Sequence, residues 1–178
     1  MNLDQLRLDS AIQQKKGLHF ILASVIIWVL VTVIHLTELS ILTKNLLTFS
    51  ATAPLVPLAY IISKIINVNF SDKSNPINQL GIVFSLNQLL YLLIAMWVFP
   101  TVPDKMVMVI AMIFGAHLLP YAWLYQSKVY ALMSILIPFI ALYVGTKFDV
   151  YVLSGLMIIC EIIFSLLLSI EVRNMLRK

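Results

Sequence analysis

Charged side chains are scarce in this sequence. Of its 178 residues, 11% are Asp, Glu, Lys or Arg, whereas 61% are hydrophobic. A water-soluble domain of this size needs far more charge to cover its surface, so a soluble globular fold is excluded. The few cations form no basic patch with interleaved aromatic residues, and we therefore expect no nucleic-acid partner.

Cysteine and glycine are also rare. The single cysteine, Cys160, excludes a disulfide within the chain and a cysteine-based zinc site. No phosphate-binding loop, nucleophile elbow or nucleotide-binding glycine pattern is present. His35 and Glu38 stand three apart without the second histidine of a zinc-protease motif. We therefore expect neither a metal nor a cofactor and favour a non-enzymatic role.

Long apolar runs are what the sequence has instead. A spanning helix needs about 20 apolar residues, because the hydrocarbon core is about 30 Å thick and each residue rises about 1.5 Å. Short loops of lysine, asparagine, proline and aspartate separate the runs. The sequence predicts an all-α, polytopic bundle of six transmembrane helices, at Gly17 to Thr37, Leu46 to Ile66, Leu80 to Phe99, Met106 to Tyr125, Val129 to Gly145 and Val150 to Val172.

The cations between the runs predict the orientation. Cytoplasmic loops of membrane proteins carry an excess of lysine and arginine. Nine of the twelve cations fall on the side that holds both ends of the chain: Arg7, Lys15, Lys16, Lys64, Lys73, Lys128, Arg173, Arg177 and Lys178. The other side has Lys44, Lys105 and Lys147. We expect a multi-pass protein of a bacterial-type plasma membrane with both termini in the cytoplasm.

Three parts follow along the chain. Residues 1–16 form a cytoplasmic segment, which is either an interfacial amphipathic helix or a frayed polar terminus. Residues 17–172 form the six-helix transmembrane domain, and residues 173–178 form a basic cytoplasmic tail. The loops leave no room for a soluble domain, so the lipid bilayer is the one partner that composition implies.

Polar residues near the middle of several runs mark a candidate site, because such residues are expensive inside a bilayer. Prolines there also interrupt helices, and we expect Pro54 and Pro57 to break or kink the second helix and Pro138 the fifth. Interruptions at matching positions of two halves would suggest inverted repeats, although the halves show no sequence similarity. The predicted ligand-binding residues are Asn87, Gln88, Tyr91, His117, Tyr121 and Glu161.

Glu161 is the sharpest of these features. It shares one helical stripe with Ser154, Ser165 and Ser169, which predicts that it faces protein rather than lipid. A carboxyl at this depth is expected to be partnered or protonated. Candidate partners are His117 and the polar residues of the third helix. The carboxyl then serves either as a cation or proton site or as a bond that locks two helices together.

The segment from Gly115 to Tyr125, GAHLLPYAWLY, followed by Ser127 and Tyr130, resembles a stretch of small six-helix bacterial membrane proteins grouped in families of unknown function. The resemblance implies no activity. It suggests that His117, Pro120, Tyr121 and Trp123 belong together.

Three function classes remain open. The leading one is a small transporter or ligand-binding membrane protein, whose midplane site takes a small polar or cationic ligand. The second is a membrane-embedded enzyme that uses His117 and Glu161, with His35, Glu38 and a metal. The third is a structural or immunity-type membrane subunit in which the polar residues join helices. The sequence leaves the substrate and the oligomeric state open, a homo-oligomer included.

Overall fold

The structure is a computed structural model that describes residues 2–70 and 75–177. Regular structure in these residues is entirely helical. Six segments are long and apolar enough to cross a membrane: Lys15–His35, Ile41–Ile65, Asn78–Thr101, Pro103–Leu124, Lys128–Lys147 and Val150–Leu176. The predicted all-α bundle of six spans is therefore confirmed, with a longer last helix than the apolar run alone indicated. Lys73 and Lys178, which contribute to the charge bias, lie outside the described residues.

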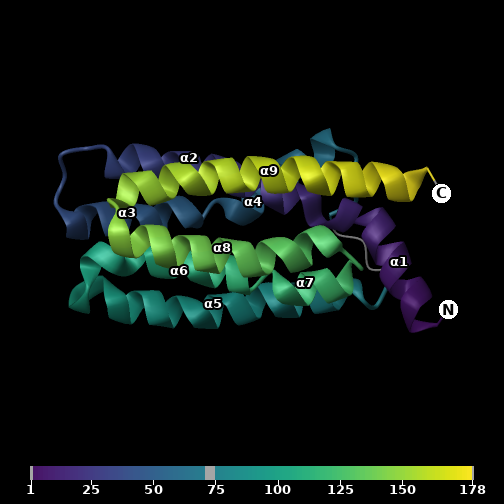
Figure 1. Ribbon diagram of the computed structural model, residues 1–178. Helices are drawn as coiled ribbons and strands as arrows, with labels where there is room; N and C mark the ends of the chain where they lie inside the picture. Colours follow the sequence, from purple (N-terminus) through teal and green to yellow (C-terminus); the bar gives the residue numbers. More distant parts are fainter. Residues whose placement is uncertain (1, 71–74, 178) are drawn as a thin grey trace.

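The spans run side by side along one axis, and both chain ends lie at the same end of the bundle (Figure 1). The first span is α2 (Leu18–His35), the third is α5 (Asn78–Thr101), the fifth is α8 (Lys128–Lys147) and the last is α9 (Val150–Leu176). An even number of crossings places the termini together. The fold does not indicate which side of a membrane the termini face; the charge bias of the sequence predicts it.

The second span is broken, as its prolines predict. It consists of α3 (Ile41–Thr52) and α4 (Leu55–Ile65), and Pro54 stands between them at the start of α4. Proline donates no backbone hydrogen bond, and its ring collides with the preceding turn, so α3 ends before it. The interruption expected here is found at Pro54, whereas Pro57 lies inside the first turn of α4 and makes no second break.

The other interruption falls in the fourth span, not the fifth. That span consists of α6 (Met106–Ala116) and α7 (Leu119–Leu124), with Pro120 in the first turn of α7. In contrast, α8 continues through Pro138 without a break. Gly115 of α6 faces that proline ring so closely that a Cβ there would lie 2.5 Å from Pro138 Cδ. The second and fourth spans do not occupy matching positions in two three-helix halves, so the expected sign of inverted repeats is missing.

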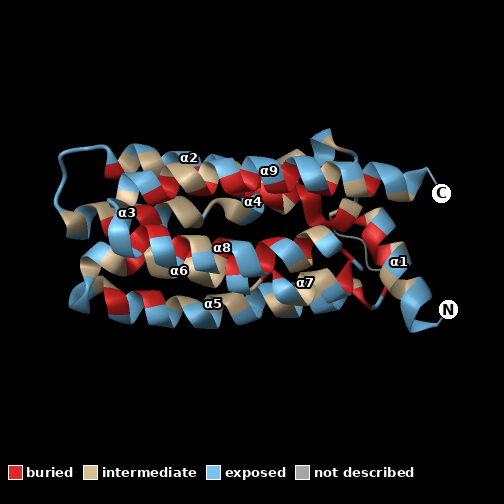
Figure 2. Ribbon diagram, viewed as in Figure 1, coloured by how far each residue is buried: buried red, intermediate tan, exposed pale blue. Residues whose placement is uncertain are grey.

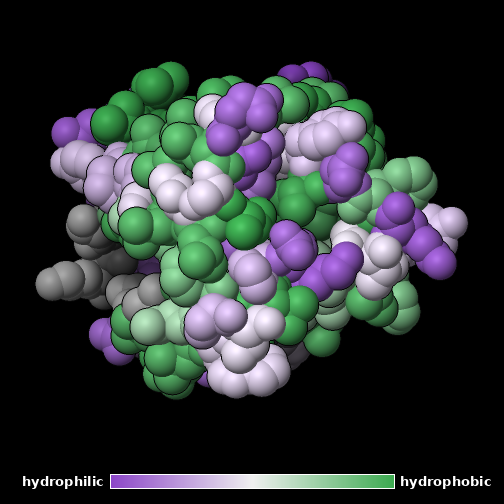
Figure 3. Space-filling view, turned by 90° about the vertical axis from the view of Figure 1, so that its left-hand side faces the viewer, coloured by the Kyte–Doolittle hydropathy of each residue, from purple (hydrophilic) through white to green (hydrophobic). Residues whose placement is uncertain are grey.

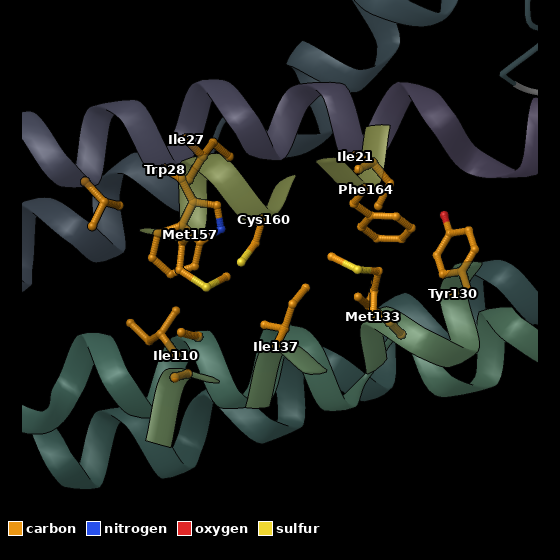
Figure 4. Packing of buried hydrophobic residues seen from close by; sticks show 14 of the residues in the cluster. Ile21, Ile27, Trp28, Ile110, Tyr130, Met133, Ile137, Met157, Cys160 and Phe164 are labelled. Carbon is orange, nitrogen blue, oxygen red and sulfur yellow. The ribbon is translucent and has the colours of Figure 1, made fainter. Parts of the chain in front are cut away.

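The core lies along the bundle axis between α2 and α9 on one side and α6 and α8 on the other (Figures 2 and 4). Ile137, Met157 and Phe164 are fully buried there. Leucine, isoleucine and aromatic side chains cover the outer surfaces, which in a membrane face lipid: Phe139 is 69% exposed and Leu90 is 63% exposed. At the end away from the termini, hydrophilic side chains appear among hydrophobic ones (Figure 3).

A short helix, α1 (Leu3–Gln13), precedes the spans and begins with a capping box between Asn2 and Gln5. The N-terminal segment is thus helical rather than frayed over these residues. It packs across the terminus-bearing end of the bundle (Figure 1). The Arg7 Nε group donates a 3.0 Å hydrogen bond to the Trp123 carbonyl, and Asn75 Nδ2 donates a 2.8 Å bond to Asp9.

The connection from α1 to α2 has an unusual backbone. Lys15, Lys16 and Gly17 have φ angles of 44°, 53° and 71°, three left-handed residues in succession. Only glycine adopts this region without a steric penalty. The surroundings hold it in place: Lys15 Nζ donates to the Ile66 carbonyl, and Lys16 Nζ lies 3.3 Å from Glu171. We call residues 15–17 the left-handed hinge.

Candidate functional site

Glu161 lies on α9 and is completely buried. It stands eleven residues after Val150, where α9 begins, which puts it about 17 Å along the helix from that end. Glu171 follows ten positions later on α9 and lies at the level of the left-handed hinge, where it contacts Lys16. This places the carboxyl near the middle of the apolar layer, as the sequence predicts.

Its hydrogen-bond partner is Ser24 on α2, 2.5 Å from Glu161 Oε2. The side chains named from sequence as candidate partners, His117 among them, do not fill this role. Helices α2 and α9 pack along their length, and the Ser24–Glu161 contact crosses their interface. Ser24 is one of few polar residues in the first span, and this polarity is the only sequence signal that could have identified it.

The Ser24 hydroxyl has two acceptors within reach but one hydrogen. Its Oγ lies 2.7 Å from the Ile21 carbonyl oxygen and 2.5 Å from Glu161 Oε2. If the hydroxyl donates to Ile21, the carboxyl must be protonated to donate to Ser24. If the hydroxyl donates to Glu161, the carboxyl is an acceptor and can be ionised. The same heavy-atom frame therefore accommodates both protonation states of Glu161.

The second carboxyl oxygen differs from the first in its bonding. Glu161 Oε1 is buried and makes no hydrogen bond within the described residues, and neither does the Ser165 hydroxyl one turn further along α9. Ser154 and Ser165 are buried with Glu161, so the predicted stripe does face the protein interior. An unsatisfied buried oxygen lowers the stability of the fold by about 1–3 kcal/mol. Packing alone gives no reason for a carboxyl at this position.

His117 and Tyr121 form a separate cluster at the break between α6 and α7. His117 Nδ1 lies 2.5 Å from the Phe114 carbonyl oxygen, and its ring meets Tyr121 edge-on at a centroid distance of 5.9 Å. The Tyr121 hydroxyl contacts Ser85 at 2.7 Å and donates a 3.0 Å bond to the Gly81 carbonyl. These bonds join α7 to α5.

The polar residues of α5 are not drawn into the interior. Asn87 donates a 2.8 Å hydrogen bond to the Tyr91 hydroxyl, one turn away on the same helix. Both side chains are exposed, while Gln88 is half-buried. The six predicted site residues therefore do not form one site. His117 contacts Tyr121, Asn87 bonds to Tyr91, and Glu161 bonds to Ser24.

Aromatic rings connect the His117 cluster to the neighbourhood of Glu161. Tyr121 packs against Tyr130 at 6.0 Å between centroids, and Tyr130 meets Phe164 edge-on at 5.0 Å. Phe164 follows Glu161 by one helical turn on α9. Figure 4 shows Tyr130 and Phe164 side by side in the core. The two polar clusters therefore share one packed layer without touching.

The two helix breaks lie at a depth similar to that of Glu161. Helices α3, α6 and α9 all begin at the end away from the termini (Figure 1). His117 stands eleven residues after the start of α6, about 17 Å along it, and Pro54 thirteen residues after the start of α3, about 20 Å. The breaks and the buried carboxyl thus form one mid-bundle layer.

The residues considered for a metal site are apart. His35 Nε2 lies 3.1 Å from the Thr48 hydroxyl, and Glu38 is exposed. Within residues 2–70 and 75–177, no three His, Cys, Asp or Glu side chains are grouped so that they could hold a metal ion.

Comparison with known proteins gives one match. The model of a family of unknown function, DUF7010, matches residues 3–171. No curated protein and no solved structure matches the chain.

Proposed function

We propose that this chain, which belongs to the family of unknown function DUF7010, is a small membrane transporter in which Glu161 takes up and releases a proton. The charge bias favours an orientation with both termini in the cytoplasm. The observation that carries the proposal is the incompletely bonded carboxyl at the middle of the bundle, with Oε1 unpartnered and Oε2 on a hydroxyl that suits either protonation state.

The protonation state of Glu161 is expected to be coupled to the arrangement of the helices around it. A protonated Glu161 fits the closed, apolar surroundings of α2 and α9. An ionised Glu161 in the same place is costly unless a cation or water reaches it. Loss of the proton therefore favours a second arrangement in which the carboxylate meets water or a cationic ligand. If Glu161 binds its proton more tightly in one arrangement than in the other, protonation shifts the equilibrium toward the first arrangement.

The broken spans supply places where such a rearrangement can occur. Discontinuous helices at the midplane are typical of transporters, because their ends can move and their backbone groups can meet a ligand. Here α3–α4 and α6–α7 are interrupted in the layer that holds Glu161.

The test is a proton-flux measurement in liposomes that contain the purified protein and an internal pH-sensitive dye. An imposed pH gradient should collapse faster with the wild type than in empty liposomes. Glu161→Gln keeps the side-chain shape and should abolish this flux. Ser154→Ala is the matched control. Ser154 is buried on the same helix, and its hydroxyl donates to the backbone carbonyl of Tyr151 on that helix.

Two results contradict the proposal: no flux above empty liposomes with the wild type, or equal flux with Glu161→Gln. The complete burial of Glu161 favours a lock between α2 and α9 as the second candidate function. In that case Glu161→Gln is silent, and an apolar residue at position 161 lowers thermal stability.

A further inference from the structure

A pocket of ≈ 280 Å³ lies at the terminus-bearing end of the bundle, where α4 ends. Its lining comes from the last turns of α4 and the segment that follows: Tyr60, Ser63, Lys64, Val68, Asn69 and Phe70. The pocket is well separated from Glu161 along the bundle axis. It lies where the second span leaves the apolar layer, which is the depth of lipid headgroups.

The backbone around the pocket is fixed by hydrogen bonds. Asn67 adopts a left-handed conformation with φ of 55°, and the Val68 amide donates a 2.8 Å bond to the Ser63 carbonyl, which closes the end of α4. Gln14 Nε2 donates a 3.1 Å bond to the Asn69 carbonyl. The lining is thus attached to α1, so the pocket is a formed feature of the fold and not a loose loop.

Tyr60 and Phe70 are the aromatic residues of the lining, and Phe70 also contacts His19 and Phe20, which lie behind it and outside the lining. Phe70 meets His19 at 5.5 Å, Phe20 at 5.6 Å and Tyr60 at 5.6 Å between ring centroids. His19 is almost fully buried, and its Nδ1 has no hydrogen-bond partner within the described residues. Most buried polar atoms in folded proteins have a hydrogen-bond partner, so a buried ring nitrogen without one is uncommon.

Among the described residues that line the pocket, the one charged side chain is the cation Lys64. The Lys64 ammonium lies 4.5 Å from the centre of the Tyr60 ring, and Lys15 Nζ donates to the neighbouring Ile66 carbonyl. Among residues 2–70 and 75–177, the ion pairs are Asp4–Arg7 and Lys16–Glu171, so neither Lys15 nor Lys64 is paired with a carboxylate there. Ammonium groups without acids offer hydrogen-bond donors to an anion.

We propose that this pocket binds the phosphate of an anionic phospholipid headgroup, with Lys64 as the main contact. Basic side chains at the cytoplasmic surface of a membrane attract anionic headgroups, and Lys64 lies at the end of α4. The aromatic wall of Tyr60 and Phe70 offers a surface for the glycerol and upper acyl carbons. This site is independent of the proton-carrying role of Glu161.

The experiment measures thermal stability of the purified protein in an uncharged detergent during titration with dioctanoyl phosphatidylglycerol. The wild type should gain stability in a saturable manner, and dioctanoyl phosphatidylcholine should give a smaller gain. Lys64→Gln should weaken the apparent affinity for phosphatidylglycerol about fivefold, as expected for one basic contact. Lys128→Gln is the matched control, because Lys128 is an exposed lysine at the same end of the bundle and outside the pocket.

Equal weakening by Lys64→Gln and Lys128→Gln would reduce the effect to general surface charge and overturn the site. So would an unchanged affinity in Lys64→Gln, or no stabilisation of the wild type by phosphatidylglycerol. Inorganic phosphate is titrated in parallel. A gain in stability with phosphate alone that is lost in Lys64→Gln would replace the lipid by a free phosphate as the ligand.

Discussion

The hydroxyl of Tyr130, in the first turn of α8, donates a 2.9 Å hydrogen bond to the backbone carbonyl of Lys16 in the left-handed hinge. Both residues are buried, and the two are separated by 114 positions in the chain. The fifth span therefore supports a strained backbone between α1 and the first span. This contact can be tested without touching the proposed proton site.

Tyr130→Phe should destabilise the protein, because it leaves the Lys16 carbonyl without its buried donor. The expected loss is about 1–3 kcal/mol, or roughly 2–4 °C in Tm per kcal/mol for a chain of this size. Thermal unfolding in detergent measures it. Tyr143→Phe is the control, since Tyr143 lies on the same helix and is 64% exposed. Equal Tm values for the two variants would show that the hinge does not depend on this bond.

Gly115→Ala should also lower the Tm. A Cβ at position 115 would lie 2.5 Å from Pro138 Cδ and 2.8 Å from Ile137 Cγ2, so α6 and α8 must separate. Overpacking of this kind costs about 1–3 kcal/mol. Gly155→Ala provides the comparison, because nothing lies within 4 Å of a Cβ there and alanine favours the helix. A Gly115→Ala protein as stable as Gly155→Ala would mean that α6 and α8 are not packed this closely.

Glu161→Met should raise the Tm. Methionine is unbranched and of similar length, it removes the unpartnered Oε1, and Ser24 keeps its bond to the Ile21 carbonyl. Relief of one unsatisfied buried oxygen corresponds to about 1–3 kcal/mol. A residue that lowers stability where an apolar one would raise it fits a functional role. A lower Tm in Glu161→Met would instead favour the lock between α2 and α9.

The orientation is testable by cysteine labelling of intact cells in a Cys160→Ser background. Asp104→Cys lies in the exposed connection between the third and fourth spans and should react with a membrane-impermeant maleimide from outside. Gln126→Cys, exposed at the opposite end, should react only after the membrane is permeabilised. The reverse pattern would invert the orientation that the charge bias predicts.

The spans and their depth could be predicted from sequence because they depend on local properties. Run length fixes the six crossings, and Pro54 lies at the interruption between α3 and α4. Helical periodicity also gave the inward face of α9, since Ser154, Glu161 and Ser165 recur on one side of it.

Contacts between helices could not be predicted in this way. Periodicity says which face of α9 is inward but not that α2 lies against it, so Ser24 was missed as the partner of Glu161. Asn87 and Tyr91 were grouped with the interior by depth alone, yet they bond to each other on an exposed side of α5. Pro138 resembles Pro54 in sequence, but it lies within a continuous helix, and the lack of a side chain at Gly115 lets α6 pack closely against its ring.

The left-handed hinge has a consequence for how the protein is made. Lys15, Lys16 and Gly17 are synthesised before the groups that hold them in place, which belong to Ile66, Tyr130 and Glu171. Until those residues have been synthesised, nothing offsets the strain of three left-handed residues in succession. The full set of contacts that supports this backbone is therefore complete only when the last span, which carries Glu171, has been added to the bundle.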